Sequence, residues 1–116
     1  MAIIAPLTPD EAARLEALVA YNVLDTPHEP VFQAITALAA AITGSPIALI
    51  SLVDKDRQWF KANWGLDARE TPRDISFCSH AIHQTELFEV TDTFTDNRFF
   101  DNPLVQGKPN IRFYAG

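Results

Sequence analysis

The residue types that can do chemistry gather in one short stretch, RDISFCSHAIHQ at positions 73–84. It holds the single cysteine, Cys78, and two of the three histidines, His80 and His83. Thiolate and imidazole are ligands that zinc prefers, and a thiol beside a base or a cation is a nucleophile. The stretch therefore allows a metal site, a nucleophile with its base, an attachment point for a cofactor, or a short helix with no chemistry.

Helical geometry argues against the metal site. Residues 78 and 80 point about 200° apart on a helix, and the remaining histidine, His28, lies far away in the sequence. Arg73 and a helix start near Cys78 could activate the thiol, but no second cysteine, Gly-rich elbow or spaced acid completes an active site. We expect no metal and no catalytic residue. Core packing and the lining of a ligand pocket both stay open for Cys78.

Composition limits the class of protein. The 116 residues suffice for one domain with one core, and a net charge of −6 argues against a nucleic-acid surface. No apolar run approaches the roughly 20 residues of a membrane span. Residues 1–11 lack the basic region of a secretory signal, and one cysteine forms no internal disulfide. We expect a cytoplasmic domain without nucleic-acid or membrane contact.

Two helices are expected in the first half of the chain. TPDE at 8–11 has the form of a capping box and predicts a helix over about 9–23. TPHE at 26–29 repeats that form and predicts a helix over about 27–43, which Gly44 ends in the left-handed conformation. The second helix carries an apolar stripe at helical spacing: Val31, Ile35, Leu38, Ala39 and Ile42.

Four strands follow, over about 47–53, 58–64, 87–92 and 111–115. The first is an apolar run that predicts burial on both faces, and a short polar turn joins it to the second as an antiparallel hairpin. Residues 65–75 are expected to form a loop, residues 76–83 a short helix, and residues 93–108 a loop with helical turns. The prediction is a single α+β domain over 1–116 with a mostly antiparallel sheet.

The segments LDTP, ISLVD-DRQWFK-GL, R-DISFC-HAI and R-F-DNPLV-IRFYAG occur in an order and spacing that resemble GAF domains. The type resembled stands at the N-terminus of bacterial sensor histidine kinases and diguanylate cyclases. The resemblance covers nearly the whole chain and implies a GAF-like (PAS-like) central antiparallel sheet flanked by helices, with a small-molecule pocket on one face. Resembled sequences continue beyond IRFYAG, so the chain is expected to lack the C-terminal strand and helix.

The same resemblance implies where a ligand binds. It places residues 73–82 in a pocket wall, residues 96–105 in a lid opposite, and Arg112 and Tyr114 on a neighbouring strand. The candidate ligand-binding residues are Asp74, Ser76, Phe77, Cys78, His80, Phe99, Arg112 and Tyr114. The ligand is unknown. Bilin-binding relatives have histidine directly after the cysteine, whereas Ser79 intervenes here, so a bilin is not expected. One cysteine also cannot run the disulfide cycle of free methionine sulfoxide reductases.

We therefore expect a regulatory, sensory GAF domain of a cytoplasmic signal-transduction protein, for example in a two-component system. It would bind a small molecule, relay binding to a fused output domain by population shift, and catalyse nothing itself. The alternative is a dimerisation or interaction module with no ligand, and a third hypothesis is a redox-active thiol protein. A homodimer is expected, through the first helix or an open sheet edge.

Overall fold

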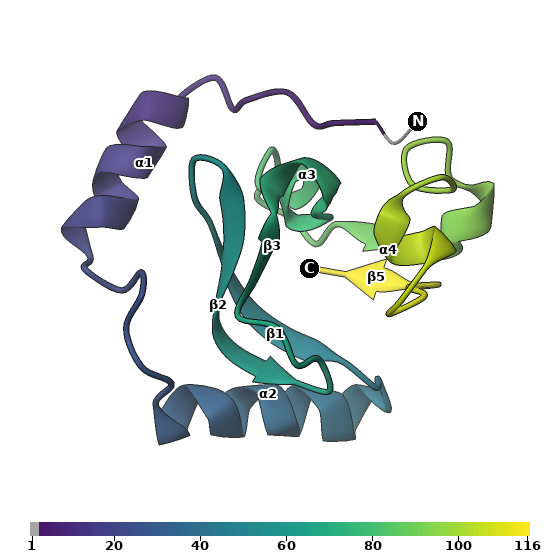
Figure 1. The fold of residues 1–116 in the computed structure, drawn as a ribbon, viewed down its shortest axis with the longest axis horizontal. Helices are drawn as coiled ribbons and strands as arrows, with labels where there is room; N and C mark the ends of the chain where they lie inside the picture. The colour runs from purple at the N-terminus through teal and green to yellow at the C-terminus, as the bar shows by residue number, and fades with distance from the viewer. Residues whose placement is uncertain (1–2) are drawn as a thin grey trace. The chain divides into compact units, whose positions relative to one another are not determined.

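The computed structural model describes residues 3–116 and has an α+β architecture, which confirms the expected class (Figure 1). Residues 1–2, at the start of the segment examined for a secretory signal, lie outside the described residues. The chain divides into two compact units. We call residues 10–73 the hairpin unit, and residues 3–9 with 74–116 the aromatic unit. A single domain over 1–116 stays a prediction.

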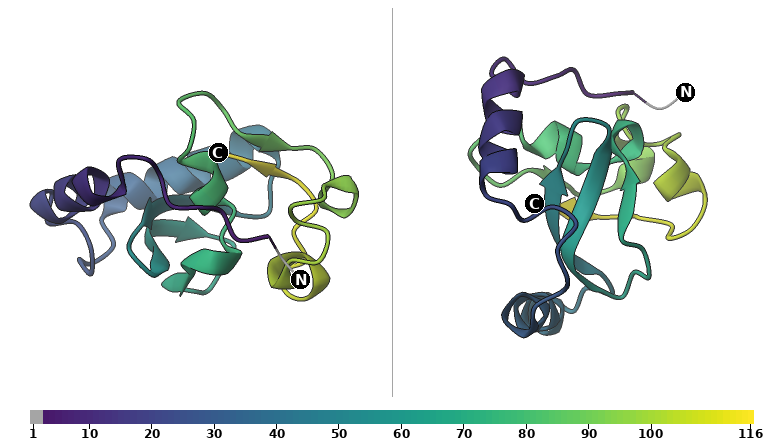
Figure 2. Two further views of the ribbon diagram at one scale, coloured as in Figure 1. Left: turned by 90° about the horizontal axis from the view of Figure 1, so that it is seen from above. Right: turned by 60° about the vertical axis from the view of Figure 1, so that its left-hand side comes forward.

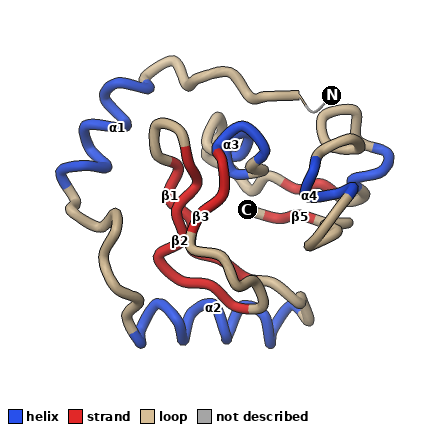
Figure 3. The backbone as a smooth tube through the Cα atoms, viewed as in Figure 1, coloured by secondary structure: helices blue, strands red, loops and turns tan. Residues whose placement is uncertain are grey.

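The hairpin unit contains two helices and a three-stranded antiparallel sheet of order β1-β2-β3 (Figure 3). Its elements are α1 (Glu11–Ala20), α2 (Pro30–Thr43), β1 (Ala48–Val53), β2 (Arg57–Trp64) and β3 (Glu70–Pro72). The aromatic unit contains short helices and a two-stranded antiparallel sheet. Its elements are the 3-10 helix η1 (Arg73–Ile75, whose first residue belongs to the hairpin unit), α3 (Cys78–Ala81), β4 (Glu89–Val90), η2 (Thr93–Thr95), α4 (Pro103–Gln106) and β5 (Tyr114–Ala115).

Both long helices are shorter than the capping signals predict. The first begins after Asp10 and ends at Ala20, because left-handed backbone at Asn22 and Asp25 cannot continue a helix. The second begins at Pro30 instead of residue 27. Glu29 precedes a proline and is extended, so TPHE forms a turn and not a capping box. Gly44 ends α2 with a left-handed φ of 67°, as predicted.

β1 and β2 form the predicted antiparallel hairpin, but β1 is less buried than expected. β1 was expected to be buried on both faces, yet only Val53 is buried, because β1 lies at the edge of the sheet. β2 lies between β1 and β3 in the sheet, and its residues 58–62 are buried. Ile50 pairs with Ala62 and Ser51 with Phe60, so β2 bulges at Lys61.

α2 packs on β1 and β2, as Figures 1 and 2 show. Its buried residues are Thr36 and Ala40, and the side chain of Gln33 accepts a hydrogen bond from the backbone N–H of Asn63 at 3.0 Å. The buried Lys61 pairs with Glu29 at 2.7 Å and donates to the carbonyl of Pro27 at 2.7 Å. These bonds fix the beginning of α2 on β2.

Some elements of the second half differ from the predictions. Residues 65–75 are not wholly a loop, because residues 70–72 pair with β2 as β3, which is too short to show alternation in the sequence. The strands expected over 87–92 and 111–115 are paired at 89–90 and 114–115, with two further backbone hydrogen bonds between residues 88 and 116. Asn110, just before the second of these segments, has left-handed backbone. Thr93 contacts that segment separately from the strand pairing: its backbone N–H donates to the carbonyl of residue 112, and its hydroxyl donates to the carbonyl of residue 111. The helix expected over 76–83 spans Cys78–Ala81.

Candidate functional site

The candidate residues all lie in the aromatic unit, and the structure brings half of them into one aromatic cluster. The rings of Phe77 and Phe99 stack face to face, with centroids 4.2 Å apart and planes inclined by 7°. Tyr114 lies against Phe77 at 5.1 Å, and the edge of His80 meets Phe99 at 4.8 Å. These four side chains are the aromatic cluster. Stacked and edge-on pairs at such distances are favourable arrangements of aromatic rings.

The aromatic cluster is part of a hydrophobic core. Phe77 is 3 % exposed and Phe99 is fully buried. Around them pack further buried and half-buried apolar residues: Phe88, Val90, Val105, Ala81, Leu104 and Ile111. The side chains expected on two facing walls of a pocket are therefore in direct contact with each other, and Phe99 fills the space that a ligand would occupy beside Phe77.

The turn before α3 positions Phe77 and Cys78. Ser76 is 1 % exposed, and its hydroxyl accepts a hydrogen bond from the backbone N–H of Ser79 at 3.2 Å. The hydroxyl of Ser79 in turn donates to the carbonyl of Ser76 at 2.7 Å. The two serines, three residues apart, thus stabilise this turn by side-chain hydrogen bonds to each other's backbone, as serine does at helix starts and turns. Ser76, a candidate ligand-binding residue, has a structural role here.

Asn102 joins the two segments that carry the stacked rings, a role that the sequence analysis missed. Its side-chain oxygen accepts from the backbone N–H of Leu104 at 2.9 Å and so caps α4. Its side-chain nitrogen donates to the carbonyl of Ile75 at 3.0 Å, and the residue is 1 % exposed. An asparagine directly before a proline is a helix-start signal. That signal could have identified the cap, though not the bond to Ile75.

The thiol of Cys78 and the phenol of Tyr114 form a hydrogen bond, with 3.1 Å between sulfur and oxygen. Cys78 is half-buried. Burial raises the pKa of Tyr114 well above its usual range, and the neighbouring Cys78 raises it further. The phenol is therefore neutral at any physiological pH and can serve as donor or acceptor to the thiol.

His80 is half-buried, and its environment favours the neutral imidazole. Burial lowers the pKa of His80, and the positive charge of Arg98 acts in the same direction. A hydrogen bond with the backbone of Ile3 and the charge of Asp96 oppose this shift without cancelling it. The ring at the edge of the aromatic cluster thus carries no charge at neutral pH.

Arg98 covers one side of the aromatic cluster, and the sequence analysis did not single it out. Its guanidinium lies over the rings of Phe88 and Phe99, 4.9 and 5.3 Å from their centroids. Asp96 holds it there through two hydrogen bonds of 2.7 and 2.9 Å, and these bonds lower the pKa of the Asp96 carboxyl. A guanidinium over aromatic faces at these distances is a favourable cation–π arrangement.

Two candidate residues, both charged, lie on the surface outside the aromatic cluster. Asp74 is exposed on η1. Arg112 is exposed, donates to the carbonyl of Val105 at 2.9 Å, and lies over the ring of Phe94 at 4.1 Å. The structure thus brings Phe77, Cys78, His80, Phe99 and Tyr114 together and leaves these two charged side chains outside.

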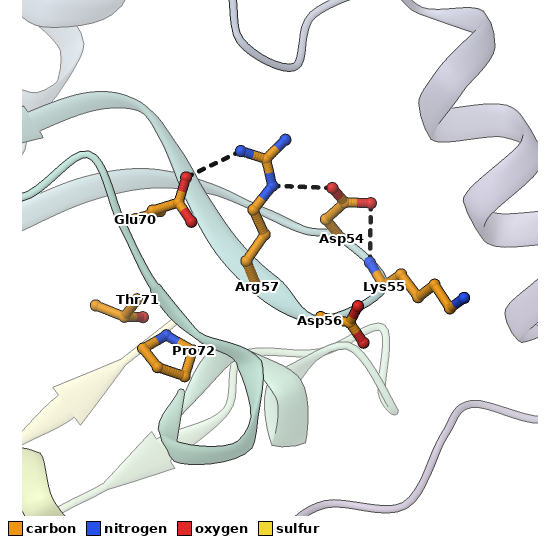
Figure 4. Close-up of a pocket in the computed structure, with 7 residues that line it drawn as sticks. All are labelled: Asp54, Lys55, Asp56, Arg57, Glu70, Thr71 and Pro72. Carbon is orange, nitrogen blue, oxygen red and sulfur yellow. Dashed lines mark hydrogen bonds and ion pairs between the residues drawn. The ribbon is translucent and has the colours of Figure 1, made fainter.

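A polar hollow lies in the hairpin unit, and none of the candidate residues lines it (Figure 4). Its lining residues are Asp54, Lys55, Asp56, Arg57, Glu70, Thr71 and Pro72. Arg57 reaches Asp54 and Glu70 at 3.0 Å and Asp25 at 2.8 Å, and these hydrogen bonds raise the pKa of its guanidinium. The guanidinium of Arg57 is therefore already paired with carboxylates. A small-molecule site is usually more apolar than this hollow.

Within residues 3–116, no three side chains of histidine, cysteine, aspartate or glutamate stand close enough to hold a metal ion. None of the helices described between those residues is long and apolar enough to cross a lipid bilayer.

No protein-family model matches the sequence. The chain is 49% identical over 111 residues to a cyclic di-GMP phosphodiesterase of Pseudomonas aeruginosa strain PAO1. The match covers 96% of this chain and 19% of that enzyme, so the chain spans about a fifth of the length of its relative.

Proposed function

We propose that this chain is a non-catalytic regulatory domain of a cyclic-di-GMP signalling protein, with a GAF-type fold and a small-molecule ligand. The observation that carries the proposal is the 49% identity with a domain-sized part of a cyclic di-GMP phosphodiesterase. Identity at that level over 96% of the chain supports a common fold and a common place in a larger protein. In such a protein the remaining four-fifths of the length has room for the catalytic part.

The order of elements supports the GAF-type fold. Two helices precede an antiparallel hairpin, a short helix follows, and a segment with helical turns leads to a last strand. The GAF resemblance implies this order, with a central sheet larger than the three-stranded and two-stranded sheets described here.

The state of Cys78 and His80 supports a regulatory role more than a catalytic one. A catalytic base or nucleophile must reach its substrate and have a pKa suited to its task. The Cys78 thiol is hydrogen-bonded to a neutral phenol, and the half-buried His80 packs its ring edge on Phe99. These groups are better placed to recognise a ligand than to transform one.

Ligand binding at the aromatic cluster would be coupled to movement of residues 96–105. Because Phe99 stacks on Phe77, a flat ligand gains a place on Phe77 only when the Phe99 ring leaves it. The movement would also break the bond from Asn102 to Ile75. A ligand that binds the open form alone shifts the population toward it, and this shift is what an output domain could sense.

Thermal unfolding of the chain with cyclic di-GMP, cyclic AMP, cyclic GMP, haem and a bilin tests this proposal. A ligand at one hundred times its dissociation constant adds about 2.7 kcal/mol to the free energy of unfolding, which raises Tm by several degrees. We expect at least one compound other than the bilin to do so. The gain should shrink in His80→Ala and persist in His83→Ala, because His83 is exposed and outside the aromatic cluster. If none of the compounds raises Tm, ligand sensing is wrong.

A further inference from the structure

Helix α1 is held on the hairpin unit more by charged groups than by apolar packing. It lies next to the turn between β1 and β2 (Figure 1), and none of its ten residues is buried. Its half-buried residues are Glu11, Arg14, Leu15 and Leu18. Three- and four-residue spacing puts them on one face of the helix, and half of that face is charged. In contrast, α2 packs on β1 and β2 without any charged side chain.

An ion pair and a hydrogen bond connect the start of α1 to the rest of the hairpin unit. The carboxylate of Glu11 accepts hydrogen bonds from the guanidinium of Arg73 at 2.7 and 3.1 Å. Arg14, three residues later in α1, pairs with the same carboxylate at 2.8 Å and donates to the carbonyl of Val53 at 2.5 Å. We call Glu11, Arg14 and Arg73 the α1 latch. Both of its α1 residues lie within the first four positions of the helix.

Each half of the α1 latch keeps hydrogen-bond partners when the two halves separate. Arg73 also donates to the carbonyls of Asp54 and Lys55, at 3.1 and 3.4 Å, in the turn between β1 and β2. Glu11 keeps its pair with Arg14 on α1. Breaking a buried ion pair is usually costly because it leaves a buried charge unpaired. Here neither charge loses all of its partners, so separation costs less than at an isolated buried pair.

The segment after α1 can serve as a hinge whose far end is fixed. Asn22 has left-handed backbone with a φ of 53°, and none of residues 21–24 is buried. The carboxylate of Asp25 then accepts two hydrogen bonds of 2.8 Å from Arg57 in β2. A few loop residues between a fixed point and a moving element are the usual form of a hinge. We propose that α1 moves between a docked and a released position by opening the α1 latch, with residues 21–24 as the hinge, while the sheet of the hairpin unit stays folded.

The docked and released positions of α1 present different surfaces. Release uncovers the guanidinium of Arg73, which is 5% exposed in the docked position, and the half-buried Leu15 and Leu18. A helix of ten residues is also too short to be stable by itself in water, so α1 loses much of its helicity when it is released. A neighbouring domain that binds one form of α1 more tightly shifts the population toward it. The inference goes beyond the proposed function, because it requires no ligand.

Hydrogen–deuterium exchange of the chain, followed by mass spectrometry, tests the proposal. In the unmodified chain the amides of α1 should exchange faster than those of residues 58–62 in β2, because α1 opens without global unfolding. Glu11→Gln keeps the shape of the side chain and removes its charge. Because a hydrogen bond to a charged group contributes more than a neutral one, the substitution should raise the exchange rate of α1 about tenfold and leave residues 58–62 unchanged. Glu16→Gln makes the same chemical change at an exposed position of α1 and is the matched control, with an expected effect of about twofold or less.

Three other results would each overturn the proposal. If the amides of α1 in the unmodified chain are as protected as those of residues 58–62, α1 does not open by itself. If Glu11→Gln speeds exchange equally in α1 and in residues 58–62, the ion pair stabilises the whole unit and is not a latch. If Glu11→Gln has no more effect than Glu16→Gln, other contacts hold α1 in place. Because no ligand enters the experiment, its failure leaves the proposed function intact.

Discussion

The substitution Phe99→Ala distinguishes a packed core from an open ligand pocket. Phe99 is fully buried, its ring stacks on Phe77 at 4.2 Å, and it also contacts His80 at 4.8 Å and Phe88 at 6.2 Å. Removing a buried phenylalanine ring costs about 3–5 kcal/mol, through lost contacts and the cavity that remains. Because three aromatic neighbours lose a partner, we expect a loss of about 4 kcal/mol in the free energy of unfolding. Such a loss is a large fraction of the stability of a typical domain.

Urea unfolding followed by circular dichroism measures this loss, with Phe100→Ala as the matched control. Phe100 is the next residue in the chain and is 46% exposed, so its substitution should cost less than about 1 kcal/mol. Phe99→Leu keeps most of the apolar volume and should fall between the two. If Phe99→Ala costs no more than Phe100→Ala, the ring does not pack a core and the description of the aromatic cluster is wrong.

Other predictions concern single groups. Arg73→Ala removes a buried guanidinium that lies 2.7 Å from the half-buried Glu11 carboxylate, which Arg14 still pairs at 2.8 Å. It should lower the free energy of unfolding by about 1.5–3 kcal/mol, whereas the exposed control Arg69→Ala should cost under about 1 kcal/mol. Folding lowers the pKa of His80, so the unfolded chain binds more protons than the folded chain just below pH 6.5. The free energy of unfolding should therefore fall from pH 7 toward pH 5. If the slope of this free energy against pH is unchanged in His80→Gln, the assignment to His80 is wrong. Iodoacetamide should alkylate the half-buried Cys78 faster in Tyr114→Phe than in the unmodified chain, and equal rates would show that the hydrogen bond does not protect the thiol.

Local signals in the sequence predict the elements of the hairpin unit but not their orientation. Gly44 and the apolar run after it locate the end of α2 and the hairpin. Periodicity finds the stripe on α2, yet it cannot tell which face meets the sheet. The small residues Thr36 and Ala40 face β1 and β2, while Ile35 and Leu38 face outward. The bulge at Lys61 and the three-residue β3 depend on pairing with distant residues, so a local pattern does not show them.

The candidate site is also predictable only in part, because a local pattern does not show contacts between residues far apart in the sequence. The resemblance to GAF domains selects residues 73–82 and 96–105, and the structure does bring Phe77 and Phe99 together. The segments that carry the two rings are joined by the bond between Asn102 and Ile75, which links residues 27 positions apart. The resemblance also selects Asp74 and Arg112, whose side chains lie on the surface outside the aromatic cluster. Whether any of these residues binds a ligand stays a prediction.

We propose that this chain regulates cyclic-di-GMP signalling without carrying the chemistry itself. The most direct test measures cyclic di-GMP hydrolysis by the isolated chain and by the Pseudomonas aeruginosa phosphodiesterase whose matching 111-residue segment has been replaced by this chain. The account predicts that the chimera hydrolyses cyclic di-GMP, also when it carries His80→Ala, and that the isolated chain does not. Hydrolysis by the isolated chain would contradict it.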